Sequence, residues 1–177
     1  MKYASIKRCD VANGTGVRVS LFVSGCRHHC PGCFNSEAWD FNFGNDFTEK
    51  EIEDIIENLK PDFIKGLSLL GGEPLEVENQ RGLLPLLRRV KEVYGDSKDI
   101  WCYSGFLFDD EILGKMYDNE VTQELLSYVD IIVDGKFDFN LKNPSLRFRG
   151  SSNQRVIDVK ESLRQGKVEI WKELEVV

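Results

Sequence analysis

The sequence predicts an α/β fold in which parallel strands alternate with helices along the chain. Two observations predict it: short apolar runs of strand length recur, and stretches with a helical spacing of apolar residues separate them. No linker, low-complexity stretch or internal repeat divides the chain, so a single domain is expected over residues 1–177. In folds of this class ligands collect at the carboxyl ends of the strands, and functional residues are expected there.

Five apolar runs predict the strands. They cover residues 17–23, 67–70, 100–103, 129–133 and 155–157. Cys26 follows the first run, Gly71 the second, Ser104 the third and Asp134 the fourth. Because parallel strands end at one edge of their sheet, these four residues are expected to lie close together.

Helices are expected between these strands. Thr48 and Glu51 form a capping box in front of an apolar helical face. A second helix is expected through residues 83–94, ending at Gly95, with Pro85 in its first turn because proline breaks later turns. Two shorter helices are expected, one capped by Asp109 and running to Met116, the other capped by Asp158 and ended by Gly166.

The charge and composition narrow the class of protein. The chain carries a net charge of −7, and 41% of its residues are apolar, an ordinary share for a globular protein. This charge argues against a surface for nucleic acid or for anionic membranes, since each needs a basic patch. No apolar run approaches the roughly 18 residues of a membrane span, and residues 1–14 lack the apolar stretch of a signal peptide. A soluble, cytoplasmic protein with no nucleic-acid or membrane partner is expected.

Three of the five cysteines lie in one short segment with the spacing Cys26-x3-Cys30-x2-Cys33. Thiolate sulfur is a soft ligand that selects zinc, copper or iron–sulfur centres. An odd cysteine count in a cytosolic chain indicates metal binding or catalysis rather than a disulfide framework. Three thiolates on a 4Fe–4S cluster leave the fourth iron open to a small molecule. The spacing therefore favours an open cluster, with these cysteines as metal ligands and catalytic centre.

Two alternatives for the cysteine segment remain open. A structural zinc site needs four protein ligands, and His28 or His29, or the distant Cys9 or Cys102, would have to supply the fourth. Alternatively, Cys30-Pro-Gly-Cys33 is a C-x-x-C pair of the kind that performs thiol–disulfide exchange.

Two motifs carry a resemblance to a known family. The loop Cys26-Arg-His-His-Cys30-Pro-Gly-Cys33-Phe34 resembles the signature of the radical S-adenosylmethionine superfamily, in which an aromatic residue stands beside the last cysteine. The turn Gly71-Gly72-Glu73-Pro74 resembles the GGEP turn of that superfamily. The resemblance implies a 4Fe–4S cluster and S-adenosylmethionine as cofactors, with this turn holding the methionyl amino group. The residue types agree, because glycines permit close backbone approach and Glu73 offers acceptors to an ammonium group. A plain strand–helix turn is the alternative for this motif.

Further cofactor contacts are expected from the same resemblance and from the order of the strands. Gly32 and Phe34 are expected at the adenine. Ser104 is a candidate for the ribose or carboxylate, with a simple Ser-Gly turn as the alternative. Asp134 is expected either to bind the cofactor or to pair with Lys136 or an arginine, and Lys136 is a candidate partner for the cofactor's carboxylate.

The length of the chain suggests an incomplete barrel. A full (β/α) barrel takes about 200 residues or more, so room remains here for an open partial barrel of about five to six parallel strands, of the radical S-adenosylmethionine type. The wide lateral mouth of such a barrel suits a macromolecular substrate.

A closer resemblance, spanning about residues 3–158, is to the activating proteins of anaerobic ribonucleoside-triphosphate reductases. The segments that carry it, besides the two motifs above, are Asn13-Gly-Thr-Gly-Val-Arg18, residues 101–106, residues 133–137 and Phe148-Arg-Gly-Ser-Ser-Asn-Gln-Arg155. It implies an enzyme that reductively cleaves S-adenosylmethionine and generates a glycyl radical on the large reductase subunit, with a flavodoxin- or ferredoxin-type protein as reductant. The alternatives are an activator of a different glycyl radical enzyme and, in another class, a non-catalytic zinc-binding module.

Overall fold

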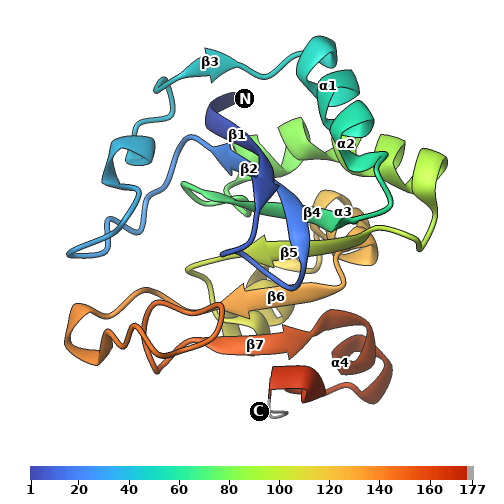
Figure 1. The fold of residues 1–177 in the computed structure, drawn as a ribbon. Coiled ribbons are helices and arrows are strands. Elements are labelled where there is room, and N and C mark those ends of the chain that lie inside the picture. Colours follow the sequence, from blue (N-terminus) through green and yellow to red (C-terminus); the bar gives the residue numbers. More distant parts are fainter. Residues whose placement is uncertain (175–177) are drawn as a thin grey trace.

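Seven strands form one mixed sheet in the computed structural model, which describes residues 1–174 (Figure 1). The strands are β1 (Lys2–Asp10), β2 (Val17–Val23), β3 (Asn45–Asp46), β4 (Ile64–Gly71), β5 (Asp99–Tyr103), β6 (Ile131–Asp134) and β7 (Arg155–Asp158). Their order across the sheet is β3-β1-β2-β4-β5-β6-β7. The sheet is therefore open, with β3 and β7 at its two edges, which confirms the expected open α/β architecture.

The sheet contains fewer parallel strands than expected. Only β2, β4, β5 and β6 are parallel to one another, while β1 and β7 run antiparallel to their neighbours. The prediction of five to six parallel strands is wrong for this reason. A parallel return needs a crossover, usually a helix, but residues 135–154 hold only a short 3-10 helix, Phe139–Leu141, and re-enter the sheet from the same end.

Most of the helices connect the parallel strands, and the last α-helix follows β7. They are α1 (Glu49–Leu59), α2 (Val77–Tyr94), the π-helix η2 (Phe108–Met116), α3 (Glu120–Tyr128) and α4 (Val159–Gln165), with short 3-10 helices at Ser36–Trp39 and Lys172–Leu174. The capping box of Thr48 and Glu51 is confirmed. So is the last helix, in which Asp158 accepts from the Glu161 N–H and Gly166 takes the left-handed conformation. No helix in residues 1–174 is both long and apolar enough to cross a membrane.

Three features of the helices differ from the sequence prediction, because tertiary contacts outweigh local sequence preferences there. Helix α2 begins at Val77, so Pro85 lies in its interior and not in its first turn. The leucines on both sides of Pro85 are buried in the core, and their burial offsets an interior-proline cost of about 3 kcal/mol. Asp109 is not a cap, because it lies inside η2 and pairs with Arg155. Helix α3 was not expected, and it moves the start of β6 from residue 129 to Ile131.

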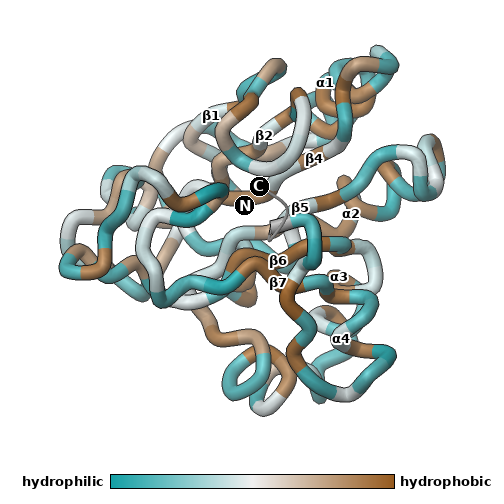
Figure 2. Tube along the Cα trace, turned by 60° about the horizontal axis from the view of Figure 1, so that its bottom comes forward, coloured by the Kyte–Doolittle hydropathy of each residue, from teal (hydrophilic) through white to brown (hydrophobic). Residues whose placement is uncertain are grey.

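The two faces of the sheet carry different apolar clusters. Ile100 and Cys102 of β5 belong to the main core, and Figure 2 shows the helices α1–α4 together along one side of the molecule. Trp101, on the other face, packs with Val133 and Val156 in a smaller cluster that also contacts Tyr103, Phe148 and Trp171. Phe148, in the loop after β6, thus packs on this second face, and Figure 1 shows the long loops after β2 and β6 extending beyond the carboxyl ends of the parallel strands.

The register brings the four parallel strands to an end at one level. Val23 of β2 lies opposite Gly71 of β4. Leu69 lies opposite Cys102, so Gly71 and Ser104 each stand two residues beyond that pair. Tyr103 lies opposite Val133, so Ser104 and Asp134 are the next residues along. The expected alignment of these strand ends is confirmed.

A buried arginine, Arg18, links the parallel strands near their amino-terminal ends. Arg18 is fully buried; its Nε donates to Ser68 Oγ at 2.7 Å, and its Nη2 donates to the carbonyl of Leu67 at 3.0 Å. The same guanidinium forms an ion pair with Asp99 at 2.5 Å and lies over the ring of Trp101. It therefore links β2, which carries Arg18, to β4 and β5, which supply its partners.

We predict that Arg18→Met destabilises the fold by about 3–5 kcal/mol, because it leaves buried carbonyls and a carboxylate without their cation. The matched control is Arg88→Met, which removes an exposed bidentate ion pair with Glu124 and should cost less than about 1 kcal/mol. Urea unfolding of both variants measures the difference. Equal costs would contradict the role assigned to Arg18.

Candidate cofactor site at the carboxyl ends of the strands

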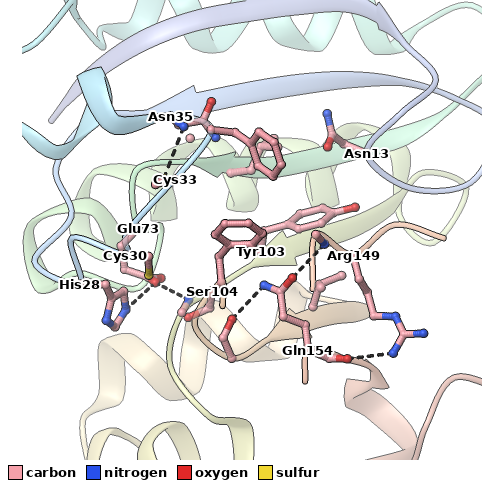
Figure 3. Close-up of a pocket in the computed structure, with 18 of the residues that line it drawn as sticks. Asn13, His28, Cys30, Cys33, Asn35, Glu73, Tyr103, Ser104, Arg149 and Gln154 are labelled. Atoms are coloured by element: carbon pink, nitrogen blue, oxygen red, sulfur yellow. Dashed lines mark hydrogen bonds and ion pairs between the residues drawn. The ribbon is translucent and has the colours of Figure 1, made fainter. Parts of the chain in front are cut away.

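A cavity of about 580 Å³ opens where the parallel strands end. This volume lies within the range of small-molecule sites, roughly 300–1,000 Å³. Its wall includes Cys26, Cys30 and Cys33 from the loop after β2, Gly71, Gly72 and Glu73 after β4, and Ser104 and Gly105 after β5. Figure 3 shows His28, Cys30 and Glu73 at one side of it and Asn13 and Arg149 at the other. The sequence predicted this convergence correctly.

Backbone hydrogen bonds join the start of the cysteine loop to the 3-10 helix at Ser36–Trp39 that follows it. Gly25 N donates to the carbonyl of Ala38 at 2.7 Å, and Cys26 N donates to that of Trp39 at 3.1 Å. The loop closes on itself, since Cys33 N donates to the carbonyl of Cys30 and the sulfur of Cys33 accepts from Asn35 N at 3.4 Å. The thiol of Cys26 is buried, and those of Cys30 and Cys33 are half-buried. All three are free thiols on one cavity wall.

The environment of these thiols fits an iron–sulfur cluster. Burial raises the pKa of Cys26 to about 11 and also raises that of Cys30, whereas backbone N–H groups, including those of His28 and His29 at Cys26, favour the thiolate. A metal centre must therefore displace these protons, and the backbone donors then stabilise the bound sulfurs. Across residues 1–174, no three His, Cys, Asp or Glu side chains are grouped around the position of a single metal ion.

The glycine-rich turn has no room for side chains. Gly71 has a φ of +103°, which disfavours any residue with a Cβ, and a Cβ there would lie 2.7 Å from the backbone of Val23. A Cβ on Gly72 would lie 2.6 Å from the carbonyl oxygen of Gly25, in the cysteine loop. Gly72 N also donates to the carbonyl of Val23 at 2.7 Å. The turn therefore packs backbone to backbone against the start of the cysteine loop.

Glu73 is almost completely buried and lines the cavity. Its Oε1 accepts from Leu75 N at 2.9 Å, and its Oε2 accepts from Gly105 N at 2.7 Å and lies 3.0 Å from His28 Nε2. Pro74 is buried behind the turn and is not among the lining residues. Within the predicted motif, the two glycines and Glu73 thus face the cavity, and Pro74 supports them.

The remaining predicted residues divide into two groups. Phe34 and Ser104 line the cavity, and Ser104 Oγ accepts from Phe106 N at 3.1 Å. Gly32 has a φ of +72° and lies under the ring of Phe139, but it does not line the cavity. The side chain of Lys136 is exposed, and its charge acts on Cys30.

Asp134 is fully buried and outside the cavity wall. Its two oxygens accept from Arg155 at 3.0 and 2.5 Å, and Oδ2 also accepts from Phe108 N at 2.8 Å. Of the roles considered for Asp134, the geometry is that of pairing with an arginine. Arg155 in turn donates to Asp109.

Comparisons with known proteins agree with this site. Residues 12–157 match the family model described as a 4Fe-4S single cluster domain. The chain is 41% identical to the anaerobic ribonucleoside-triphosphate reductase-activating protein of Pasteurella multocida, over 87% of this chain and 95% of that protein. The protein of the same name in Escherichia coli K12 is 42% identical over 88% and 97%, and that of Enterobacteria phage T4 is 40% identical over 88% and 93%.

The chain belongs to the family of anaerobic ribonucleoside-triphosphate reductase-activating proteins. This confirms the closer resemblance, over about residues 3–158, to these activating proteins.

The structure adds cavity residues that the sequence did not assign to cofactor binding in this family member. Trp39 Nε1, Tyr103 OH and Arg149 Nε belong to lining residues, and each is buried without a hydrogen-bond partner in the described part of the chain. Burial raises the pKa of Tyr103, so its phenol is a neutral donor. Three orphaned donors around one cavity fit a polar ligand. Their only sequence signal was position, because Tyr103 precedes Ser104 and Arg149 lies in the polar run near the C-terminus.

We predict that Gly72→Ala lowers iron uptake and destabilises the protein by about 1–3 kcal/mol, because its methyl group would displace the backbone of Gly25. Gly114→Ala is the control, since its nearest contact would be a 3.2 Å approach to the carbonyl of Asp109. Iron analysis after anaerobic reconstitution and thermal unfolding measure both effects. Full iron uptake by Gly72→Ala would contradict the tight packing described for this turn.

We predict a pH-dependent cost for Asp109→Asn. The hydrogen bonds from Arg155 lower the pKa of Asp109 below its usual 3.8, so the folded state favours the ionised carboxylate. The resulting stability is present above about pH 4 and is lost as the pH falls through the lowered pKa. Because the pair is half-exposed, the variant should cost less than about 1 kcal/mol at pH 7 and almost nothing near pH 2. Urea unfolding at both pH values tests this, and a cost independent of pH would contradict it.

Proposed function

We propose that this protein is a radical S-adenosylmethionine enzyme, an open partial barrel that holds a 4Fe–4S cluster on Cys26, Cys30 and Cys33. The observation that carries the proposal is the arrangement of the cavity: three thiols of one loop share its wall with the glycine-rich turn that follows the next strand. Three thiolates satisfy three irons, which leaves the fourth open to a ligand in the same cavity. The match to a 4Fe-4S single cluster domain supports a cluster of this type in the chain.

The chain's own residues would bind and orient the second cofactor. Gly71 and Gly72 let the backbone approach it closely, and Glu73 supplies an acceptor for its ammonium group. Phe34 offers a ring and Ser104 a hydroxyl on the same wall. We assign Pro74 and Gly32 to shaping the turn and the cysteine loop, Lys136 to the carboxylate of the cofactor, and Asp134 to holding the neighbouring loop.

The chemistry follows from these groups. When bound and reduced, the cluster supplies one electron to the sulfonium of S-adenosylmethionine, giving methionine and a 5′-deoxyadenosyl group able to abstract hydrogen. The lining residues would hold the sulfonium beside its electron donor. Trp39 Nε1 and Tyr103 OH are buried donors with no partner in the described residues, and they are available to the ligand.

The substrate of this reaction is a protein. The relatives in Pasteurella multocida, Escherichia coli and phage T4 are named activating proteins of anaerobic ribonucleoside-triphosphate reductase. We propose the same partner here: a glycine of the large reductase subunit gives up the hydrogen and stores the radical. The open sheet leaves a side through which a loop of that subunit can reach the cavity. We propose a flavodoxin- or ferredoxin-type reductant and a cytoplasmic location.

The test is anaerobic reconstitution with iron and sulfide, followed by reduction and addition of S-adenosylmethionine. We predict a brown protein that releases 5′-deoxyadenosine and raises a glycyl radical signal on the large reductase subunit. Cys30→Ser should lose 5′-deoxyadenosine formation by at least about a hundredfold, because the cluster loses one of its three ligands. Cys9→Ser is the matched control, since Cys9 is exposed on β1 and away from the cavity.

The alternatives give different results in the same experiment. A colourless protein that binds one zinc ion and releases no 5′-deoxyadenosine is a zinc-binding module, and the proposal is wrong. Cleavage without a radical on this reductase, but with one on a different glycyl radical enzyme, would keep the chemistry and replace the partner.

A further inference from the structure

His28 lies inside the cysteine loop, yet its side chain points away from solvent. The side chain is only 8% exposed, and its Nε2 lies 3.0 Å from Oε2 of Glu73. The ring packs edge-on against Phe106, with 4.4 Å between the centroids. Its neighbour His29 differs, because it is exposed and stacks on Trp39. Of the two histidines in the loop, only His28 reaches the glycine-rich turn.

The carboxylate of Glu73 has nearly all of its acceptor positions filled. A carboxylate offers about four lone-pair positions. Leu75 N occupies one on Oε1, and Gly105 N and His28 occupy two on Oε2. One position on Oε1 remains, on a side chain that lines the cavity. The three donors thus fix the orientation of the carboxylate and leave about one position for a ligand.

The contacts around the Glu73 carboxylate join three loops that follow different strands. His28 follows β2, Glu73 follows β4 and Gly105 follows β5. A Cβ on Gly105 would lie 2.5 Å from the ring of His28, so a glycine at this position makes room for the imidazole. Edge-on contact with Phe106 then holds the ring in the plane that directs Nε2 to the carboxylate.

The cysteine loop has a separate attachment that does not involve His28. Arg27 N donates to Glu76 Oε1 at 2.9 Å. The guanidinium of Arg27 pairs with Glu76 and, at 2.7 Å, with Glu78 at the start of α2. The loop should therefore stay in place when the His28 donor is removed, and a change at His28 is expected to act on Glu73.

We propose that His28 is a positioning residue for S-adenosylmethionine: its Nε2–H donates to Glu73 and holds the last free acceptor of that carboxylate toward the cofactor's ammonium group. This inference rests on the proposed function, since it assigns a role within the same cofactor site.

The test compares binding of S-adenosylmethionine, by anaerobic equilibrium dialysis, in cluster-loaded wild type and variants. His28→Phe keeps an aromatic ring against Phe106 but removes the donor, and its Kd should rise about tenfold, the effect of one hydrogen bond to a charged group. Its iron and sulfide content should equal that of wild type. His28→Gln restores an N–H donor at a similar distance and should bind within about threefold of wild type. Cys9→Ser, the exposed control on β1, should bind like wild type.

A second readout needs no cofactor. Hydrogen exchange at the amide of Gly105 should be faster in cluster-free His28→Phe than in cluster-free wild type, because the shared carboxylate loses its fixed position. If the phenylalanine variant does not fold, His28→Asn replaces it, since asparagine is polar but too short to reach Glu73.

The outcomes are separable. If wild type binds S-adenosylmethionine and the donor-less variant binds it equally well, the inference is overturned and the proposed function stands. If His28→Gln binds as weakly as the donor-less variant, the donor role is overturned. If cluster-loaded wild type does not bind S-adenosylmethionine at all, the proposed function and this inference fail together.

Discussion

The site depends on the parallel pairing of β2 with β4, in which Val23 stands opposite Gly71. Neighbouring strands lie about 4.8 Å apart, so the cysteine loop and the glycine-rich turn must leave the sheet side by side. Backbones this close leave no space for a Cβ at Gly71 or Gly72. The two motifs are about 40 residues apart in sequence, and this register alone places them on one cavity wall.

Two carboxylates then fix the loop that follows β5. Glu73, after β4, accepts from Gly105 N, and Asp134, at the end of β6, accepts from Phe108 N. Each carboxylate receives three donors in all. The loop that carries Ser104 is thus held from both neighbouring strands. The difference between the two carboxylates is access, because Glu73 lines the cavity whereas Asp134 is fully enclosed and ion-paired. That difference is why Glu73 stays in the proposed cofactor contacts.

Much of this arrangement could be predicted from the sequence, because spacing rules report local structure. The capping box at Thr48 and the strand ends at Gly71 and Ser104 were predicted correctly from such local signals. The antiparallel direction of β7 was not, because direction depends on where residues 135–154 fold. The partners of His28 could not be predicted either, since Glu73 lies 45 residues away in sequence and only the register brings them together.

The two sides of the cavity carry different polar groups, and this difference limits which ligands the cavity can bind. Near the cysteines the buried groups are thiols and the carboxylate of Glu73, which favour metal and cationic groups. Across the cavity, Figure 3 shows Arg149 and Tyr103, whose buried donors Nε and OH have no partner among the described residues. Buried donors without partners are costly, so a ligand is favoured that brings a cation to one side and acceptors to the other. S-adenosylmethionine has that polarity, because its sulfonium and ammonium are cationic and its hydroxyl groups and adenine ring nitrogens accept hydrogen bonds.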